Sequence, residues 1–244
     1  MNAMIKLVRA ELRLVRREPL VLTFVFALPV ITVLVIGGAF GTHPSTAFAG
    51  VRPSQWYVSS YLAIVIGAIG LVALPAHIAG YRERGVLRRF GAAGFPRWSF
   101  ALAQVVTALV LTVVGSVVML AVAAAVYGVP AVASPVALGA GVILGALAFC
   151  SLGLLLGSVL PNARSAQAVG LLVFFPSLLL GGGGPPPSQL GATMRTIAQA
   201  LPLTQVTDAI RDPWLGLGSA TIHLAVVVVI LALSVLGWRR AVAL

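Results

Sequence analysis

Long uncharged apolar runs alternate with short polar or charged segments along the whole chain. Runs of this kind can cross a hydrocarbon core of roughly 30 Å as helices that rise 1.5 Å per residue. None of the runs contains an aspartate, glutamate, lysine or arginine. The pattern predicts an all-α integral membrane protein, with one transmembrane domain over residues 1–244 and six membrane-spanning helices at 20–40, 58–80, 99–127, 136–160, 166–180 and 217–238.

Residues 1–18 form a different pattern, in which basic residues alternate with apolar residues at helical spacing. This predicts an amphipathic helix on the cytoplasmic membrane surface, with its basic face toward anionic lipid headgroups. Pro19 is expected to end this helix, because the residue before a proline is disfavoured in the helical region. A cleaved signal peptide is the alternative, since Ala47-Phe48-Ala49 resembles a cleavage site. The first apolar run is longer than the roughly 7–15 residues of a signal core, which favours a retained span.

The segment 181–216 precedes the last predicted span and begins with four glycines and three prolines. Such a tract stops a helix abruptly. The apolar residues that follow it fall on one helical face; they are Leu190, Met194, Ile197 and Leu201. The sequence therefore predicts one short extracellular helix of about thirteen residues, too short to span and hence re-entrant or interfacial.

Composition supports the membrane assignment, because 60% of the residues are apolar and only 9% are charged. The net charge of +11 does not indicate nucleic-acid binding, since the basic residues occur in short clusters beside the apolar runs. Thirteen of the sixteen basic residues fall in the two termini and in the loops 81–98 and 161–165. By the positive-inside rule these parts face the cytoplasm, which predicts a multi-pass plasma-membrane protein with both termini cytoplasmic.

The chain lacks the sequence features of an enzyme. No paired carboxylates, metal-ligand spacing or nucleophile elbow occurs in the predicted spans, so no catalytic or metal-binding residue is assigned. Lys6 is the only lysine, and the phosphate-binding pattern GxxxxGK[ST] therefore cannot occur. Any ATP that drives the protein must be hydrolysed on another polypeptide. Proton or sodium coupling is poorly supported, because spans that carry such ions usually retain charged residues.

Small residues recur along the fourth predicted span, where glycines lie four or eight residues apart at Gly141, Gly145, Gly153 and Gly157. This spacing lets helix backbones approach closely. Two interpretations are possible, packing within one subunit or a seam between two subunits. Packing within the subunit is favoured, because every span in a bundle needs close neighbours.

The stretch 81–98, YRERGVLRRFGAAGFPRW, is a charged segment between two apolar runs. A loop that only fixes topology needs basic residues but no apolar ones. Here Val86, Leu87 and Phe90 stand among the arginines at positions i, i+1 and i+4. We therefore expect this cytoplasmic loop to form a short helix that docks on a partner.

The order of these segments resembles that of the type-2 ABC exporter permeases, over essentially the whole chain. Two local stretches carry the resemblance, Glu83-Arg84-Gly85 before a small-residue and proline stretch, and LPLTQVTDAIRDPW before the last span. The resemblance implies a transmembrane subunit that pairs with a second permease copy, as a homodimer or with a paralogue. It also implies two separate ABC ATPase subunits that bind the ATP and magnesium, so that this chain needs no cofactor of its own.

In such permeases the loop after the second span is a coupling helix that docks in a groove of the ATPase. Carried over to this sequence, the docking residues are Glu83, Arg84, Val86, Leu87, Arg88, Arg89 and Phe90. Glu83 is assigned to loop geometry, the apolar residues to the groove and the arginines to acidic groups at its rim.

The resemblance also implies a cleft between the first, second and fifth spans of two copies. Possible wall residues are Phe24, Phe26, Ser59, Ser60, Tyr61, Phe174 and Phe175. Because the spans are uncharged, an apolar or amphipathic cargo such as a drug, an antibiotic or a lipid is expected. Export of a polysaccharide or lipid-linked glycan is the alternative cargo. A non-transporting membrane scaffold that recruits a cytoplasmic partner is the alternative class.

Overall fold

The computed structural model describes residues 2–15, 17–40, 43–92, 94 and 97–243, and the described residues form helices, turns and loops without strands. The chain is therefore an all-α membrane protein. Five helical stretches are long and apolar enough to cross a membrane: Thr46–Glu83, Trp98–Val126, Pro135–Val159, Ala163–Gly183 and Thr221–Ala241. The interval 20–40 predicted as the first span is also helical, but its apolar helix Thr23–Ala39 is shorter than these five. It consists of α2 (Pro19–Leu22), a π-helical turn (Thr23–Ala27) and α3 (Leu28–Ala39).

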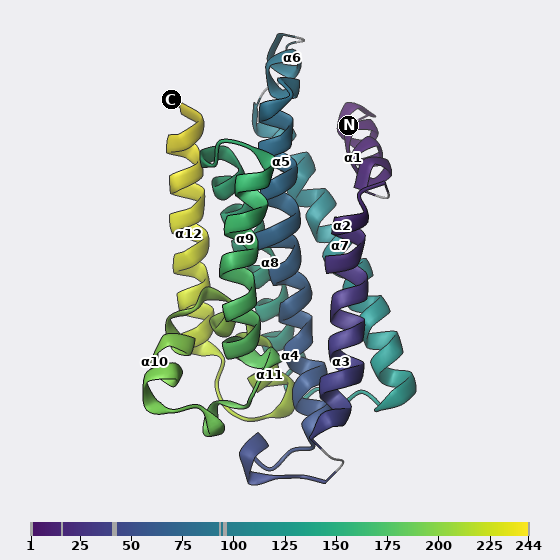
Figure 1. The fold of residues 1–244 in the computed structure, drawn as a ribbon, viewed down its shortest axis with the longest axis vertical. Helices are drawn as coiled ribbons and strands as arrows, with labels where there is room; N and C mark the ends of the chain where they lie inside the picture. Colours follow the sequence, from purple (N-terminus) through teal and green to yellow (C-terminus); the bar gives the residue numbers. More distant parts are fainter. Residues whose placement is uncertain (1, 16, 41–42, 93, 95–96, 244) are drawn as a thin grey trace.

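The second predicted span is the centre of the bundle. It is one continuous helix made of α4 (Pro53–Gly67), a π-helical turn (Ala68–Ala73) and α5 (Leu74–Glu83). Its most apolar stretch is 89% buried inside the chain, whereas that of α12 (Thr221–Ala243) is 11% buried. Figure 1 shows α3, α7 (Arg97–Val126), α8 (Pro135–Val159) and α9 (Ala163–Leu178) beside this central helix. The outer faces of α7 and α12 are left for lipid or for a partner.

The two ends of the bundle differ in what they carry (Figure 1). Both chain termini, α1 (Asn2–Val15) and α6 (Val86–Ala92) lie at one end. The short helices α10 (Ala192–Ala200) and α11 (Pro202–Leu215) lie at the other end. The basic termini and the charged loop are thus gathered on one side, the arrangement that the positive-inside rule requires.

Glycines of α8 pack against other helices of the same chain. A methyl group added at Gly145 would come 2.6 Å from Val206, and one at Gly157 would come 2.6 Å from Ile78. One at Gly153 would come 2.5 Å from the carbonyl oxygen of Gly70 in the central helix. These contacts confirm packing within one subunit as the role of this glycine stripe.

At three further places a glycine of one helix packs against a backbone carbonyl of another helix. In each case that carbonyl belongs to the residue four positions before a proline. A proline inside a helix has no N–H for that carbonyl. Added methyl groups at Gly170, Gly141 and Gly115 would lie 2.0, 2.5 and 3.2 Å from the carbonyl oxygens of Leu71, Ala209 and Val25. The corresponding prolines are Pro75, Pro213 and Pro29. The backbone of a neighbouring helix therefore packs closely against each carbonyl that lacks its helical N–H donor because of the proline.

The segment 181–216 contains two helices where the sequence predicted one, and this expectation was wrong. Leu201 has an extended backbone (φ −78°, ψ 131°) and Pro202 begins α11. The physical reason is the proline, which excludes the residue before it from the helical region but suits the first turn of a new helix. The two helices differ in burial, since α10 is mostly exposed and α11 packs against α4, α8 and α12.

The glycine tract before these helices is buried against α4. Tyr57 and Tyr61 donate hydrogen bonds to the carbonyl oxygens of Gly184 (2.9 Å) and Gly183 (3.1 Å). Gly182 has a φ of 123°, which only glycine adopts easily, and an added methyl group would lie 2.7 Å from Thr207. Trp56 and Tyr57, in the first turns of α4, are buried in the core. The tract thus joins the end of α9 to the outer half of the central helix.

Candidate coupling site and outer polar cluster

The turn between α5 and α6 is made by Arg84 and Gly85. Arg84 ends α5 with a backbone that is no longer helical (φ −79°, ψ 2°), and Gly85 follows in the left-handed region (φ 68°). Glycine reaches this conformation without a steric cost, so the chain turns sharply and starts a new helix at Val86. Within the predicted loop 81–98, residues 93, 95 and 96 lie outside the described part of the chain.

Two adjacent side chains at the end of α5 cap two other helices. The Arg82 guanidinium donates to the carbonyl oxygens of Gly157 (3.1 Å) and Leu160 (2.9 Å) at the end of α8. The Glu83 carboxylate accepts a hydrogen bond from the Ala163 backbone N–H (3.2 Å) at the start of α9. Each charge suits its helix end, because helix C-termini attract cations and N-termini attract anions. The base of the charged loop is therefore fixed to the return between α8 and α9.

The apolar residues predicted to dock on a partner contact their own chain. Val86, Leu87 and Phe90 are half-buried against a cluster that includes Tyr81 and Phe100. The Phe90 and Phe100 rings lie 6.1 Å apart between centroids. The exposed residues of α6 are Arg88, Arg89, Gly91 and Ala92, so the long side chains that α6 exposes are the two basic ones. The Arg84 side chain is also exposed and lies over the Tyr81 ring, 5.7 Å from its centroid.

An acidic residue of the amino-terminal helix is buried against α5. Glu11 is only 2% exposed. Its carboxylate forms a hydrogen bond with His77 Nε2 (2.9 Å) and accepts hydrogen bonds from the Tyr81 hydroxyl (3.1 and 3.2 Å). This contact was not predicted from the sequence, although Glu11 follows Val8 by three residues and precedes Val15 by four. An acid on the apolar face of an amphipathic helix is the signal that could have revealed it.

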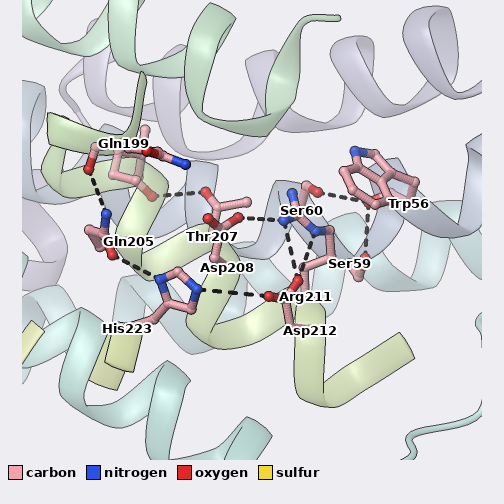
Figure 2. Close-up of polar contacts among 11 residues, drawn as sticks. Trp56, Ser59, Ser60, Gln199, Gln205, Thr207, Asp208, Arg211, Asp212 and His223 are labelled. Carbon is pink, nitrogen blue, oxygen red and sulfur yellow. Dashed lines mark hydrogen bonds and ion pairs between the residues drawn. The ribbon is translucent and has the colours of Figure 1, made fainter. Parts of the chain in front are cut away.

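At the opposite end, Arg211 of α11 is the centre of a buried polar cluster (Figure 2). Its guanidinium is stacked over the Trp56 ring, 3.9 Å from the ring centroid, and the residue is 5% exposed. It forms ion pairs with Asp208, one turn earlier, and with Asp212 (3.2 Å). The cluster fixes α11 to the start of the second span through a charge that is paired in the protein interior.

The cluster continues to the last span through His223. Its ring nitrogens lie 2.8 Å from Gln205 Oε1 and 3.9 Å from Asp212 Oδ2. Burial raises the pKa of the Asp208 carboxyl, and the neighbouring Arg211 guanidinium partly opposes that rise. The Asp208–Arg211 spacing of three residues could have been noticed in the sequence. The participation of Trp56 and His223 could not, because they lie on other helices.

The residues proposed as cleft walls lie in two environments. Ser59, Ser60, Tyr61 and Phe174 are fully buried inside the chain. Phe24 and Phe26 are half-buried, and Phe175 is exposed. The Phe24 ring makes edge contacts with Phe174 and Phe175, at centroid distances of 6.2 and 6.3 Å. The structure therefore places an aromatic surface, formed by Phe24 and Phe175, where the first and fifth predicted spans meet, whereas the serines and Tyr61 are buried in the core.

Comparison with known families agrees with this arrangement of a bundle, a projecting short helix and paired outer helices. Residues 3–214 match the family described as ABC-2 type transporter. The chain belongs to the ABC-2 type transporter family. A search of curated proteins and a search of solved structures each found no match. As an ABC-2 membrane domain, the chain is a transmembrane permease subunit of an ABC transporter. The partner of this membrane subunit is an ABC ATPase.

Proposed function

We propose that this ABC-2 permease exports an apolar or amphipathic substrate, such as a drug, an antibiotic or a lipid, with ATP hydrolysed on two separate subunits. The observation that carries the proposal is the position of α6. This helix projects beyond the bundle at the end where both termini lie (Figure 1), and its long exposed side chains, Arg88 and Arg89, are basic. With six spans this end is cytoplasmic, which puts α6 where an ATPase can reach it.

The capping contacts give a route for mechanical work. Because Arg82 and Glu83 hold the ends of α8 and α9, a displacement of α6 acts on both helices as well as on α5. We assign Arg88 and Arg89 to the contact with acidic groups of the ATPase. The apolar side of α6 packs against the bundle through the half-buried Val86, Leu87 and Phe90. These three residues also take part in docking through their remaining exposed surface.

The transport path is assigned to the interface between two permease copies, as a homodimer or with a paralogue. Exposed apolar residues of α9 and of the π-helical turn after it (Leu179–Gly183) continue the aromatic surface of Phe24 and Phe175; they include Leu172 and Leu179. This uncharged surface suits an apolar or amphipathic cargo, because a strongly charged one would cross it without partners. Phe24, Phe26 and Phe175 are the wall residues favoured by their exposure.

Docking is tested by co-purifying the chain with its ATPase. The double variant Arg88→Glu/Arg89→Glu should lose the complex and the coupled ATP hydrolysis, and Glu83→Ala should weaken coupling because the cap on α9 is lost. Phe90→Ala removes the ring that packs α6 against Phe100, and it tests whether docking depends on this packing. The matched control is Arg52→Glu, a charge reversal at an exposed arginine before α4, at the opposite end of the central helix from α6. If the double variant binds and stimulates the ATPase as the wild type does, α6 is not the docking site.

Transport is tested separately, in vesicles that contain the permease and its ATPase. ATP-dependent movement of an amphipathic dye or a lipid is expected, and movement of a lipid-linked glycan alone would indicate the alternative cargo. A complex that hydrolyses ATP but moves none of these would favour a scaffold that recruits a partner. Transport that stops when the proton gradient collapses and continues without ATP would indicate an ion-coupled carrier.

A further inference from the structure

A small, half-open cavity lies between the central helix and α7, and His77 joins it to the buried Glu11. Its polar lining residues are His77 of α5 and Gln104 and Thr107 of α7. The rest of the lining is apolar and includes Leu74 and Ala108. The centre of a water molecule has about 20 Å³ in which to move there. A cavity needs roughly 10–15 Å³ by this measure to hold one water, so the space suits a single small polar molecule.

Two of the lining side chains carry polar atoms without a partner. Gln104 Nε2 and Thr107 Oγ1 have no hydrogen bond among the described residues, although these residues are only 2% and 3% exposed. A buried polar group without a hydrogen bond is costly, most of all in a protein surrounded by hydrocarbon. Buried polar groups are normally satisfied by protein or by ordered water. The two atoms therefore indicate that the cavity holds a hydrogen-bonding molecule.

The cavity also connects with the contact between α1 and α5. His77 lines it and is hydrogen-bonded through Nε2 to the Glu11 carboxylate (2.9 Å). On the central helix the wall includes Ile69 and Ala73 from the π-helical turn Ala68–Ala73. Such turns are rare and frequently occur at functional sites. The central helix and α7 thus enclose a small space with a few polar groups, and α1 reaches it through His77.

We propose that this cavity is a hydration site, in which one water molecule bonds to Gln104 Nε2, Thr107 Oγ1 and His77 Nδ1, the ring nitrogen that is not bonded to Glu11. Three partners are what a buried water usually has. The water completes a hydrogen-bonded path from Glu11 of the amino-terminal helix, through His77 of the second span, to α7. Through this path a movement of α1 is transmitted to the third predicted span. The site stands on its own contacts and does not depend on which substrate is transported.

Hydroxyl-radical footprinting with synchrotron X-rays tests the site, because a bound water produces radicals beside buried side chains. Leu74, which lines the cavity, should be oxidised several-fold faster than Leu62, which does not. Both leucines are 5% exposed, so bulk solvent reaches them equally. Equal oxidation of the two residues in the wild-type protein would overturn the proposal.

Variants separate a hydrated site from a dry one. Thr107→Val keeps the shape of the side chain but removes the hydroxyl, and it should lower both the oxidation of Leu74 and the melting temperature. The matched control is Thr112→Val on the same helix, because the Thr112 hydroxyl is also buried but donates to the Ala108 carbonyl (2.9 Å); this change should leave Leu74 oxidation unaltered. Ala108→Leu, which fills the cavity, should abolish the fast oxidation.

A dry cavity would give the opposite result for Thr107→Val. In a dry cavity Thr107→Val removes an unsatisfied buried hydroxyl, so the melting temperature would rise and the oxidation of Leu74 would not change. Either observation would contradict the proposal. If Thr107→Val does not fold, Gln104→Leu provides the same comparison from the second polar group.

Discussion

The Tyr81 hydroxyl donates a hydrogen bond to the carboxylate of Glu11, a residue 70 positions earlier in the chain. This contact joins the amphipathic helix α1 to the end of the second predicted span, directly before the loop that leads to α6. His77 bonds to the same carboxylate one turn earlier on α5. The helices α1 and α6, which lie at the same end of the bundle, are therefore attached to the same short stretch of α5.

Removal of the Glu11 carboxylate should release α1 from the bundle. Glu11→Ala leaves the Tyr81 hydroxyl and His77 Nε2 without their buried acceptor, which costs about 1–3 kcal/mol. We expect faster hydrogen–deuterium exchange throughout α1 and little change in the core of the bundle. Tyr81→Phe, which removes one donor, should give a smaller effect. Glu18→Ala is the control, and exchange in α1 that is equal in both alanine variants would contradict this role of Glu11.

A matched pair of glycines in α8 tests the close packing against α11. In Gly141→Ala the new methyl group would lie 2.5 Å from the Ala209 carbonyl oxygen, whereas at Gly139 nothing lies within 4 Å. Gly141→Ala should destabilise the protein by about 1–3 kcal/mol, because the helices must separate. Gly139→Ala should be neutral or stabilising by up to about 1 kcal/mol through helix propensity. Thermal unfolding in detergent distinguishes them, and equal melting temperatures would show that this contact is not tight.

The buried arginine of the outer cluster should be sensitive to loss of its charge. Arg211→Met leaves Asp208 and Asp212 without their nearest positive partner and should cost about 3–5 kcal/mol. Arg211→Lys keeps the charge but loses the flat guanidinium that stacks on Trp56, so an intermediate loss is expected. Thermal unfolding provides the measurement, and Arg52→Met serves as the exposed control. Tolerance of Arg211→Met would mean that the ion pairs contribute nothing to the fold.

The raised pKa of Asp208 predicts a specific pH dependence. Because burial lifts the pKa of this carboxyl in the folded protein above the ordinary 3.8, the folded state binds the proton more tightly than the unfolded state. The resulting stability is fully present below pH 3.8 and is lost as the pH rises through the folded pKa, by about 1.4 kcal/mol for each pH unit that separates the two pKa values. Asp208→Asn lacks this titration. The stability of the wild type relative to Asp208→Asn should therefore fall with rising pH, and a difference that rises would contradict the assignment.

How far the candidate sites could be predicted differs between the two ends of the protein. The charged loop was evident from its composition, and Glu83 was expected to shape it. Its bond to Ala163 was not expected, because it joins residues 80 positions apart. The half-buried state of Val86, Leu87 and Phe90 also depends on Phe100, which lies on the following helix. At the outer end the pairing of Arg211 with Asp208 is local, but the stacking on Trp56 is not.

The sequence by itself determined the membrane class, the apolar runs, the bias of basic residues and the lack of a phosphate-binding lysine motif. These properties depend on local composition and spacing, which the chain carries before it folds. Only the tertiary structure decided that Glu11 is buried, that Gly141 faces the Ala209 carbonyl and that two outer helices replace the predicted one. Close packing brings together groups that are far apart in the sequence, and apolar periodicity does not say which faces meet. The partners of each buried polar group therefore became known only from the fold.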